Sequence, residues 1–234
     1  VKASTRRELP RLKEFVRAGA VAVSKFVAEI FGFARDTLAR GIIRAGIPVN
    51  VVTLTGPVVV SLLFIPMYIG TQWLAGIVLI VAGAFDMLDG AVARISKRST
   101  SFGGFLDSVT DRYTDLLILF GILVYLLNFV HGPNRRLYLV LWGLAATGTV
   151  TTSYIRARAE TVISECKVGF MERAERTVTI IIGFLCGNMH ITLWILAIFS
   201  NLISVQRIFY AHTVMSGREP RGKFLYWSYP RLTV

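Results

Sequence analysis

Charged residues are scarce in this sequence. Only 17% of its 234 residues are Asp, Glu, Lys or Arg, whereas an ordinary soluble domain carries about 25%. Hydrophobic side chains make up 54% of the chain, and the mean hydropathy is +0.59. The shortage of charge, together with long apolar runs, argues against a soluble globular protein. It predicts an all-α integral membrane protein with several transmembrane helices.

Histidine and cysteine are scarcer still, with three His and two Cys in the whole chain. Cys166 and Cys186 show none of the short spacings that are typical of zinc sites or redox motifs. We therefore expect each of them to be a buried, inert thiol. A metal site in this protein has to be built from other donors.

Acidic residues are outnumbered by basic ones, 14 against 26, so the formal net charge is +12. Such an excess would suit a nucleic-acid partner, but here the basic residues lie between apolar runs. The positive-inside rule places Lys and Arg in cytoplasmic loops in this way. Only Arg135 and Arg136 fall in a loop on the opposite side. We therefore expect no nucleic-acid partner, and a multi-pass protein of the plasma membrane with both termini cytoplasmic.

Six apolar runs approach the length of about 20 residues that a helix needs to cross a bilayer. Pro57 and Pro66 lie in the first run, where neighbouring helices can satisfy the freed backbone groups. All six belong to one predicted domain, residues 47–214. The six predicted transmembrane helices are residues 49–70, 73–94, 104–129, 137–159, 174–188 and 190–212.

The two ends of the chain are basic and less apolar. Residues 1–30 are predicted to be a linker or an interfacial helix, and residues 215–234 a cytoplasmic tail. Residues 31–46 alternate arginine with apolar residues at helical spacing. A basic amphipathic helix of this kind is expected to lie at the membrane interface, on an anionic leaflet. An ordinary surface helix is the alternative.

Four aspartates stand out within residues 86–111, DMLDGAVARISKRSTSFGGFLDSVTD. An ionised aspartate costs about 2.5–3.5 kcal/mol inside a membrane helix, so the cluster needs a compensating partner. Asp86 and Asp89 are spaced i,i+3. Asp107 and Asp111 are spaced i,i+4, so each pair shares one helix face. Carboxylates without His or Cys favour a hard divalent cation. We expect two helices to face each other across a metal site, with a salt-bridge network as the alternative.

The complete pattern is D-x2-D-G-x2-A-R-x8-G-x3-D-x3-D, which adds Gly90, Ala93, Arg94 and Gly103 at fixed spacing. It resembles the signature of the CDP-alcohol phosphotransferase family, membrane enzymes that make phospholipid head groups. The resemblance implies Mg2+ or Mn2+, as two ions, as the cofactor. It also implies a homodimer in the inner membrane of a bacterium or archaeon, with the active site on the cytoplasmic side.

The resemblance assigns roles to the four aspartates. It implies that Asp86, Asp89 and Asp107 are metal ligands. Asp111 is a ligand, the general base for the acceptor hydroxyl, or both. Metal ions held by carboxylates would neutralise the pyrophosphate of a CDP-linked substrate and its leaving group.

A second set of residues is implied to bind CDP. Asn50 and Thr53 belong to a Pro-x-x-x-x-Thr segment that begins at Pro48 and looks like a family feature. Some of these residues have alternative explanations: Asn50 also suits a helix N-cap, Arg94 a juxtamembrane anchor, and Gly103 close helix packing. The implied CDP-binding residues are Asn50, Thr53, Asp86, Asp89, Gly90, Ala93, Arg94, Gly103 and Asp107.

Five arginines in the second half of the chain predict a site for an acceptor that itself carries phosphate. Arginine within or beside a transmembrane helix needs an anion or a carboxylate as its partner. The segments SYIRARAE and ERAER resemble the family branch that uses inositol phosphate as acceptor and makes phosphatidylinositol phosphate or archaetidylinositol phosphate. Simple pairing with Glu160, Glu172 and Glu175 is the alternative. The five arginines are Arg156, Arg158, Arg173, Arg176 and Arg207.

Together these features predict an enzyme that uses a CDP-linked lipid, CDP-diacylglycerol or CDP-archaeol. It would transfer a substituted phosphate group to a hydroxyl of inositol phosphate and release CMP. One alternative is transfer from CDP-inositol to inositol phosphate. Another is a different acceptor for the CDP-linked lipid, such as glycerol phosphate or serine. A cation transporter is the alternative of a different class. Transporters often carry inverted repeats, and no internal repeat is visible in this sequence.

Overall fold

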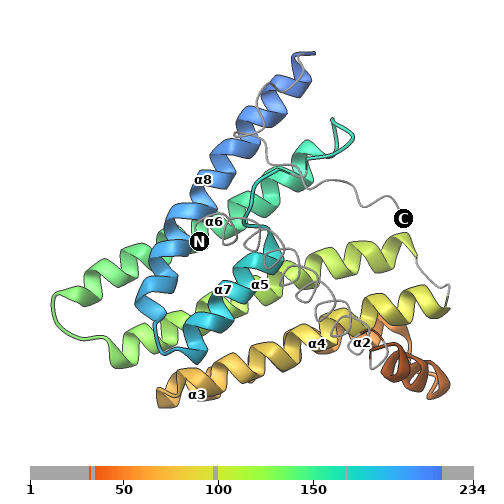
Figure 1. Ribbon diagram of the computed structural model, residues 1–234, viewed down its shortest axis with the longest axis horizontal. Coiled ribbons are helices and arrows are strands. Elements are labelled where there is room, and N and C mark those ends of the chain that lie inside the picture. The colour runs from red at the N-terminus through yellow and green to blue at the C-terminus, as the bar shows by residue number, and fades with distance from the viewer. Residues whose placement is uncertain (1–31, 33–34, 97–99, 167, 218–234) are drawn as a thin grey trace, which may run out of the picture.

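The computed structural model describes residues 32, 35–96, 100–166 and 168–217, and every regular element within them is a helix (Figure 1). The predicted segment of residues 1–30, and residues 218–234 of the predicted tail, lie outside the described residues. The labelled helices are α2 (Val49–Ser61), α3 (Phe64–Ile69), α4 (Gln72–Ser96), α5 (Ser101–Phe129), α6 (Asn134–Ala159), α7 (Arg173–Leu185) and α8 (Met189–Met215).

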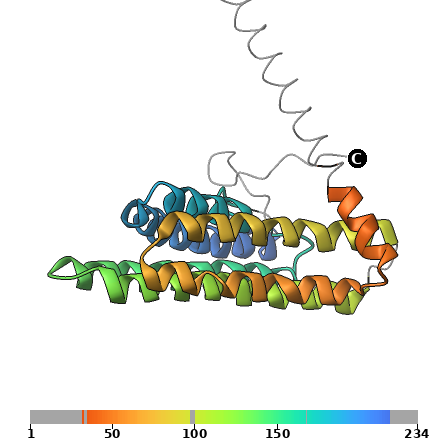
Figure 2. The same cartoon turned by 90° about the horizontal axis from the view of Figure 1, so that it is seen from below.

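The helices form two layers, which Figure 2 shows edge-on. One layer holds α2, α5 and α6, and the other holds α4, α7 and α8. Across the layers α2 packs against α4, and α6 packs against α8 more extensively than any other pair of labelled helices. The shared core includes Ile122 of α5, Phe184 of α7 and Leu193 of α8, all of them fully buried.

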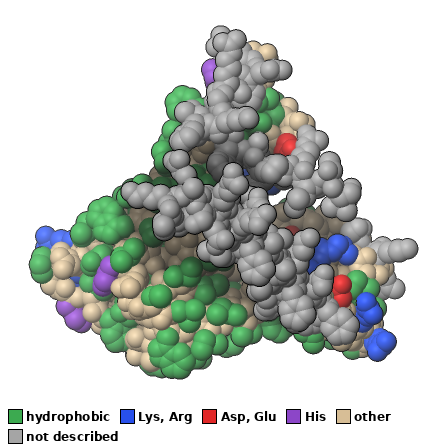
Figure 3. All heavy atoms as spheres, in the orientation of Figure 1, with side chains coloured by type: hydrophobic (Ala, Val, Ile, Leu, Met, Phe, Trp, Pro, Cys, Tyr) green, Lys and Arg blue, Asp and Glu red, His purple; other side chains and the backbone are tan. Residues whose placement is uncertain are grey.

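Four helical segments are long and apolar enough to cross a membrane: Val49–Ile69, which joins α2 and α3, and the helices α4, α5 and α8. Hydrophobic side chains form broad patches at the lower left of Figure 3, and large apolar side chains are exposed on several helices. Val58 and Ile65, for example, are 66% and 61% exposed. Soluble monomers rarely expose such large apolar surfaces. The structure is therefore that of a helical membrane protein.

The observed helices follow the order of the six predicted transmembrane helices. The fifth of them, α7, has only 13 residues, which is shorter than the length of about 20 residues that a crossing helix needs. The fourth, α6, contains several Thr and Gly residues and ends in two arginines. These two helices do not meet the criterion of length and apolar composition, so six crossings stay a prediction.

The first predicted transmembrane helix is interrupted. Between α2 and α3, Leu62 and Leu63 leave the regular helix. Pro66 lies in α3 and has no N–H to donate, and a proline ring clashes with the carbonyl four residues earlier, here that of Leu62. The interruption therefore has a local cause. Gly70 then ends α3 with φ 85°, a left-handed conformation that glycine adopts without strain.

A helical segment before α2, residues 35–44, falls within the predicted amphipathic helix of residues 31–46. Its Ala39 is fully buried and packs in one cluster with Ala91 and Val92 of α4. Part of its apolar face is therefore covered by the protein itself. Its position at a membrane interface stays a prediction.

The two cysteines differ in their surroundings. Cys166 is buried as predicted, and burial raises the pKa of its thiol above the ordinary value. The prediction was wrong for Cys186, which is exposed. The reason is that α7 ends at Leu185, so Cys186 lies in the turn to α8 instead of on a packed helix face.

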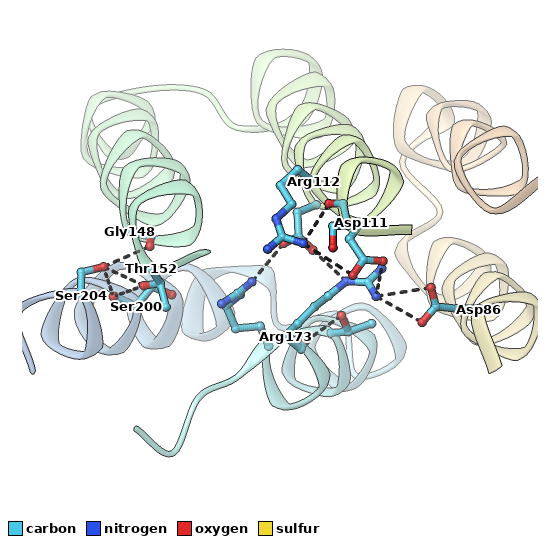
Figure 4. Close-up of polar contacts among 12 residues, drawn as sticks. Asp86, Asp111, Arg112, Gly148, Thr152, Arg173, Ser200 and Ser204 are labelled. Carbon is cyan, nitrogen blue, oxygen red and sulfur yellow. Dashed lines mark hydrogen bonds and ion pairs between the residues drawn. The ribbon is translucent and has the colours of Figure 1, made fainter. Parts of the chain in front are cut away.

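A polar seam joins α6 to α8 (Figure 4). A Cβ atom at Gly148 would lie 2.8 Å from Cβ of Ser200, so the glycine permits close approach of the two helices. The Thr152 hydroxyl donates to the Ser200 carbonyl at 2.8 Å and lies 2.7 Å from the Ser204 hydroxyl. Small residues and hydroxyl groups are typical of tight packing between membrane helices. This seam fixes the position of Arg207, one turn further along α8.

Candidate active site

Three of the four predicted aspartates come together at one point between α4 and α5. Carboxylate oxygens of Asp86, Asp107 and Asp111 lie within 4.8 Å of one another. The loop between the two helices ends at Thr100, whose hydroxyl accepts a hydrogen bond from the Gly103 amide at 3.0 Å and caps α5. With the start of α5 fixed in this way, Asp107 and Asp111 share a helix face that points to Asp86.

Helices α4 and α5 pack weakly against each other along their length, whereas α2 packs well against both of them. Asp89, the fourth predicted aspartate, is outside the group of three. It is buried, at 8% exposure, and interacts with the hydroxyl of Thr53 on α2.

The donor set suits a hard divalent cation. Mg2+ prefers oxygen ligands at about 2.0–2.1 Å in an octahedron, so opposite ligand oxygens are separated by about 4.2 Å. The spread of 4.8 Å among the three aspartates is close to that separation. Carboxylates from two helices could therefore hold such an ion after a small closure.

Arg173, the first residue of α7, extends into this acidic group. Its Nη1 lies 2.7 Å from Oδ1 of Asp111 and 3.2 Å from Oδ2 of Asp86. Figure 4 shows the guanidinium between the two carboxylates. The sequence predicted Arg173 as an acceptor-binding residue, and the structure also places it against the predicted metal ligands.

Next to the carboxylates lies a cavity of about 110 Å3. Five arginines and three acidic residues contribute to its lining, so positive charge predominates. Such a cavity can bind a phosphate group by multiple charged hydrogen bonds. The lining residues are Asp111, Arg112, Asp115, Ser153, Arg156, Glu172, Arg173, Arg176 and Arg207.

Four of the five predicted acceptor arginines therefore meet at one cavity. The exception is Arg158, which is exposed at the end of α6 with its Nη1 3.5 Å from the Thr161 hydroxyl. The spacing explains the difference, because residues i and i+2 on a helix point in different directions. Arg156 faces the cavity, and Arg158 does not.

Arg207 is the most buried of these arginines, at 3% exposure. Its Nε donates to the Val168 carbonyl at 3.0 Å and its Nη1 to the Thr152 carbonyl at 2.9 Å. Its Nη2 lies 3.6 Å from Oε1 of Glu172, which is also 3.6 Å from Nη1 of Arg156. The alternative of Arg–Glu pairing thus holds for both arginines. This pairing is compatible with phosphate binding, because a guanidinium has five N–H donors and a single glutamate does not use all of them.

Sequence reasoning missed Asp115. This residue lies on α5 one turn after Asp111, is 11% exposed, and its Oδ2 is 3.0 Å from Nη2 of Arg176. A signal was present, since 107, 111 and 115 continue one i,i+4 series. Arg112 and Ser153 were missed too, and nothing in their local sequence sets them apart.

Two of the residues implied to bind CDP, Asn50 and Thr53, lie on α2, which packs against both α4 and α5. Asn50 is inside α2, whose N-cap is Pro48, so its alternative role as an N-cap was wrong. Its side chain comes close to the start of α5, because a Cβ atom on Gly103 would be 3.8 Å from Oδ1 of Asn50. Asn50 also lines a cavity of about 450 Å3, together with Thr100 and residues of α4.

The remaining implied residues follow Asp89 on α4. Within 4 Å, a Cβ atom on Gly90 would meet only Nη1 of Arg94, at 3.5 Å, among the contacts of the described residues. Arg94 itself is exposed and Ala93 is partly buried. The face of α4 at Gly90 is therefore open, as expected if a ligand approaches the backbone there.

The sequence of this chain matches a family model and several curated relatives. The family model described as CDP-alcohol phosphatidyltransferase matches residues 47–215. The archaetidylinositol phosphate synthase of Pyrococcus horikoshii is 36% identical over 180 residues, which cover 75% of this chain and 89% of the relative. The phosphatidylinositol phosphate synthase of Mycobacterium tuberculosis is 34% identical over 196 residues, covering 78% and 87%.

Solved structures of the Mycobacterium tuberculosis phosphatidylinositol phosphate synthase are similar to this chain. The structure with CDP-DAG bound has a TM-score of 0.70 at 28% identity and covers 76% of this chain and 94% of that chain. The structure in complex with manganese and citrate has a TM-score of 0.70 at 29% identity, with coverage of 76% and 89%.

Proposed function

This chain belongs to the CDP-alcohol phosphatidyltransferase family, and from this premise we propose that it transfers a substituted phosphate group from a CDP-linked lipid to a hydroxyl of inositol phosphate, releasing CMP. The observation that carries the proposal is one shared residue. Asp111 belongs both to the group of three carboxylates and to the lining of the arginine cavity. A metal site and a phosphate-type cavity therefore adjoin at a single carboxylate.

The donor would be held at the carboxylate group. Asp86, Asp107 and Asp111 would bind Mg2+ or Mn2+, and Asp89 would contribute from the adjoining turn of α4. Bound metal supplies charge neutralisation at the pyrophosphate and at the departing CMP. Two structures of one relative, solved with CDP-DAG and with manganese and citrate, support this assignment. CDP-diacylglycerol and CDP-archaeol are the donors that the named relatives suggest.

The nucleotide of the donor would lie on the α2 side of the carboxylates. Gly90 leaves the α4 backbone open there, and Asn50 lines the cavity of about 450 Å3 at the start of α2. The proposed CDP-binding residues are Asn50, Thr53, Gly90, Ala93, Arg94 and Gly103, in addition to the aspartates.

The acceptor would enter from the arginine cavity. We assign its phosphate to Arg156, Arg173, Arg176 and Arg207, and we leave out Arg158 because it lies away from the cavity. Asp111 would take the proton from the attacking hydroxyl, since it is the carboxylate common to both sites. The new bond forms between the acceptor oxygen and the lipid-linked phosphorus. The bond from that phosphorus to CMP breaks, and CMP leaves.

The membrane arrangement that fits this reaction has six crossings, with the carboxylates and both termini on the cytoplasmic side. CDP-linked lipids and soluble inositol phosphate would both reach the site there. A homodimer is proposed from the family resemblance.

The test is CMP release by the purified full-length chain in detergent or lipid. CDP-diacylglycerol, CDP-archaeol and CDP-inositol are each combined with inositol phosphate, glycerol phosphate or serine, with and without Mg2+ or Mn2+. We expect metal-dependent CMP release from a CDP-linked lipid only with inositol phosphate. CMP release with another acceptor would correct the substrate. Metal uptake into vesicles without any CMP release would overturn the function.

A further inference from the structure

Arg173 contacts two different groups of acids. Its Nη1 reaches Asp86 and Asp111, which are predicted metal ligands. Its Nε lies 3.7 Å from Oδ1 of Asp115, which is not in the metal-type group. That Nε is buried and has no hydrogen-bond partner among the described residues. The guanidinium thus forms an ion pair with a neighbouring carboxylate to which it does not donate a hydrogen bond.

Asp115 is well placed to receive it. The carboxylate is 11% exposed, and its Oδ2 lies 3.0 Å from Nη2 of Arg176. Arg176 is itself nearly fully buried. A shift of Arg173 by less than about 1 Å would bring Nε within the usual hydrogen-bond distance of about 2.9 Å from Asp115. Both arginines would then be bound to one carboxylate at the wall of the acceptor cavity.

Arg173 and a divalent cation compete for the same carboxylates. The guanidinium Nη1 is 2.7 Å from Oδ1 of Asp111, whereas a bound Mg2+ would need an oxygen of this carboxylate at about 2.1 Å. Two cations so close in a partly buried site repel strongly, because the effective dielectric constant there is far below that of water. Metal binding therefore has to displace Arg173 from Asp86 and Asp111.

We propose that Arg173 exchanges carboxylate partners when the metal binds, and that Asp115 is the positioning residue that receives it. Without metal, Arg173 neutralises Asp86 and Asp111. With metal bound, Arg173 gives up these two contacts and its Nε donates a hydrogen bond to Asp115, so that Arg173 and Arg176 both face the phosphate of the acceptor. Acceptor and metal then bind with positive coupling, each raising the affinity of the other by the same factor. This inference rests on the proposed function for the metal and for the acceptor.

The first test measures Mn2+ affinity from the spin-resonance signal of free Mn2+, without turnover. Arg173→Gln removes the competing cation, so we expect it to bind Mn2+ about ten-fold more tightly than the unmodified chain. The matched control is Arg112→Gln, because Arg112 lies 3.8 Å from Oδ2 of Asp111 and its Nη1 donates to the Ser108 carbonyl. We expect this control to change Mn2+ affinity by less than about two-fold.

Two results would overturn the exchange. One is unchanged or weaker Mn2+ binding by Arg173→Gln. The other is an equal gain in Arg112→Gln, which would indicate a general charge effect in place of exchange. If the unmodified chain bound no Mn2+, the proposed function itself would fail, so the two failures are distinguishable.

The second test measures inositol phosphate affinity by calorimetry with and without Mn2+. In the unmodified chain we expect Mn2+ to raise this affinity about ten-fold. In Asp115→Asn the gain should fall below about three-fold while Mn2+ affinity is retained, and Asp115→Glu should restore part of the gain. A full gain in Asp115→Asn would refute the positioning role. Loss of Mn2+ binding in both Asp115 variants would also refute the positioning role, because Asp115 would then be a metal ligand. Thermal melting checks that both variants are folded.

Discussion

At the scale of single residues, the proposed function gives Asp111 two roles. It is one of three carboxylates whose oxygens lie within 4.8 Å of one another, and it also lines the cavity that holds the arginines. At that position Asp111 could bind the metal and could also take the proton from the attacking hydroxyl.

Asp111→Asn is therefore expected to lower CMP release by at least about 100-fold, because general base catalysis alone typically contributes about 10²–10⁴-fold. The fold and much of the CDP-lipid binding should remain. The measurement is kcat with saturating inositol phosphate. Asp36→Asn, a change in an acid that pairs with Arg35 far along the sequence from the site, serves as the control. Unchanged turnover in Asp111→Asn would exclude the role.

Loss of an arginine from the cavity should weaken acceptor binding, and loss of Arg207 should also lower stability. Arg207 donates to two backbone carbonyls and lies beside Glu172, so Arg207→Ala should raise the acceptor KM and also lower stability. Arg156→Ala and Arg176→Ala should likewise raise the acceptor KM more than the donor KM. Initial rates over a matrix of donor and acceptor concentrations separate the two.

The control for these variants is Arg158→Ala, which changes a neighbouring arginine on the same helix that is exposed and outside the cavity. Its acceptor KM should stay within about two-fold of the unmodified value, as for surface positions away from a site. If Arg158→Ala raised the acceptor KM as much as Arg156→Ala, the cavity would not be the acceptor site.

At the scale of helices, the seam between α6 and α8 determines where Arg207 lies. Gly148, Thr152 and Ser204 let the two helices approach and hydrogen-bond. The Thr152 carbonyl in that seam accepts a hydrogen bond from Arg207. The packing of α6 against α8 therefore also positions Arg207 at the arginine cavity.

Gly148→Ala should lower stability by about 1–3 kcal/mol, the usual cost of overpacking. The added Cβ atom would come within 2.9 Å of the Asn201 backbone nitrogen, which cannot rotate away. The matched control is Gly143→Ala on the same helix, where nothing described lies within 4 Å of the new atom. Thermal unfolding in detergent should show a lower Tm for the first variant alone. Equal Tm values would mean that the helices can separate without cost.

At the scale of the whole molecule, the two cysteines report the orientation in the membrane. Cys186 lies in the turn between α7 and α8, at the opposite end of α7 from Arg173. With the carboxylates on the cytoplasmic side, a membrane-impermeant maleimide should label Cys186 in intact cells. Cys166 should react only after denaturation, because it is buried and its raised thiol pKa lowers the fraction of reactive thiolate.

The variant Cys186→Ser gives the background for this experiment, since Cys166 is then the only thiol left in the chain. Labelling of Cys186 that requires permeabilised cells would reverse the proposed orientation. It would leave the chemistry of the site unaffected.

The order of the helices and the faces of the aspartates were predictable from the sequence. Apolar run lengths and the i,i+4 spacing of Asp107 and Asp111 are local properties, and local hydrogen bonding within a helix converts them directly into geometry. The eight-position pattern that includes these aspartates also identified the family. It could be read directly from the sequence because all eight positions lie within 26 consecutive residues, 86–111.

Tertiary structure alone decided which side chains meet across helices. Asp86 and Arg173 are 87 residues apart, and no periodicity in the chain indicates their pairing. The exclusion of Arg158, the burial of Asp89 beside Thr53 and the exposure of Cys186 likewise depend on where each helix ends and which neighbour covers it. Helix periodicity sets the face on which a side chain lies, whereas packing between helices decides what that face meets.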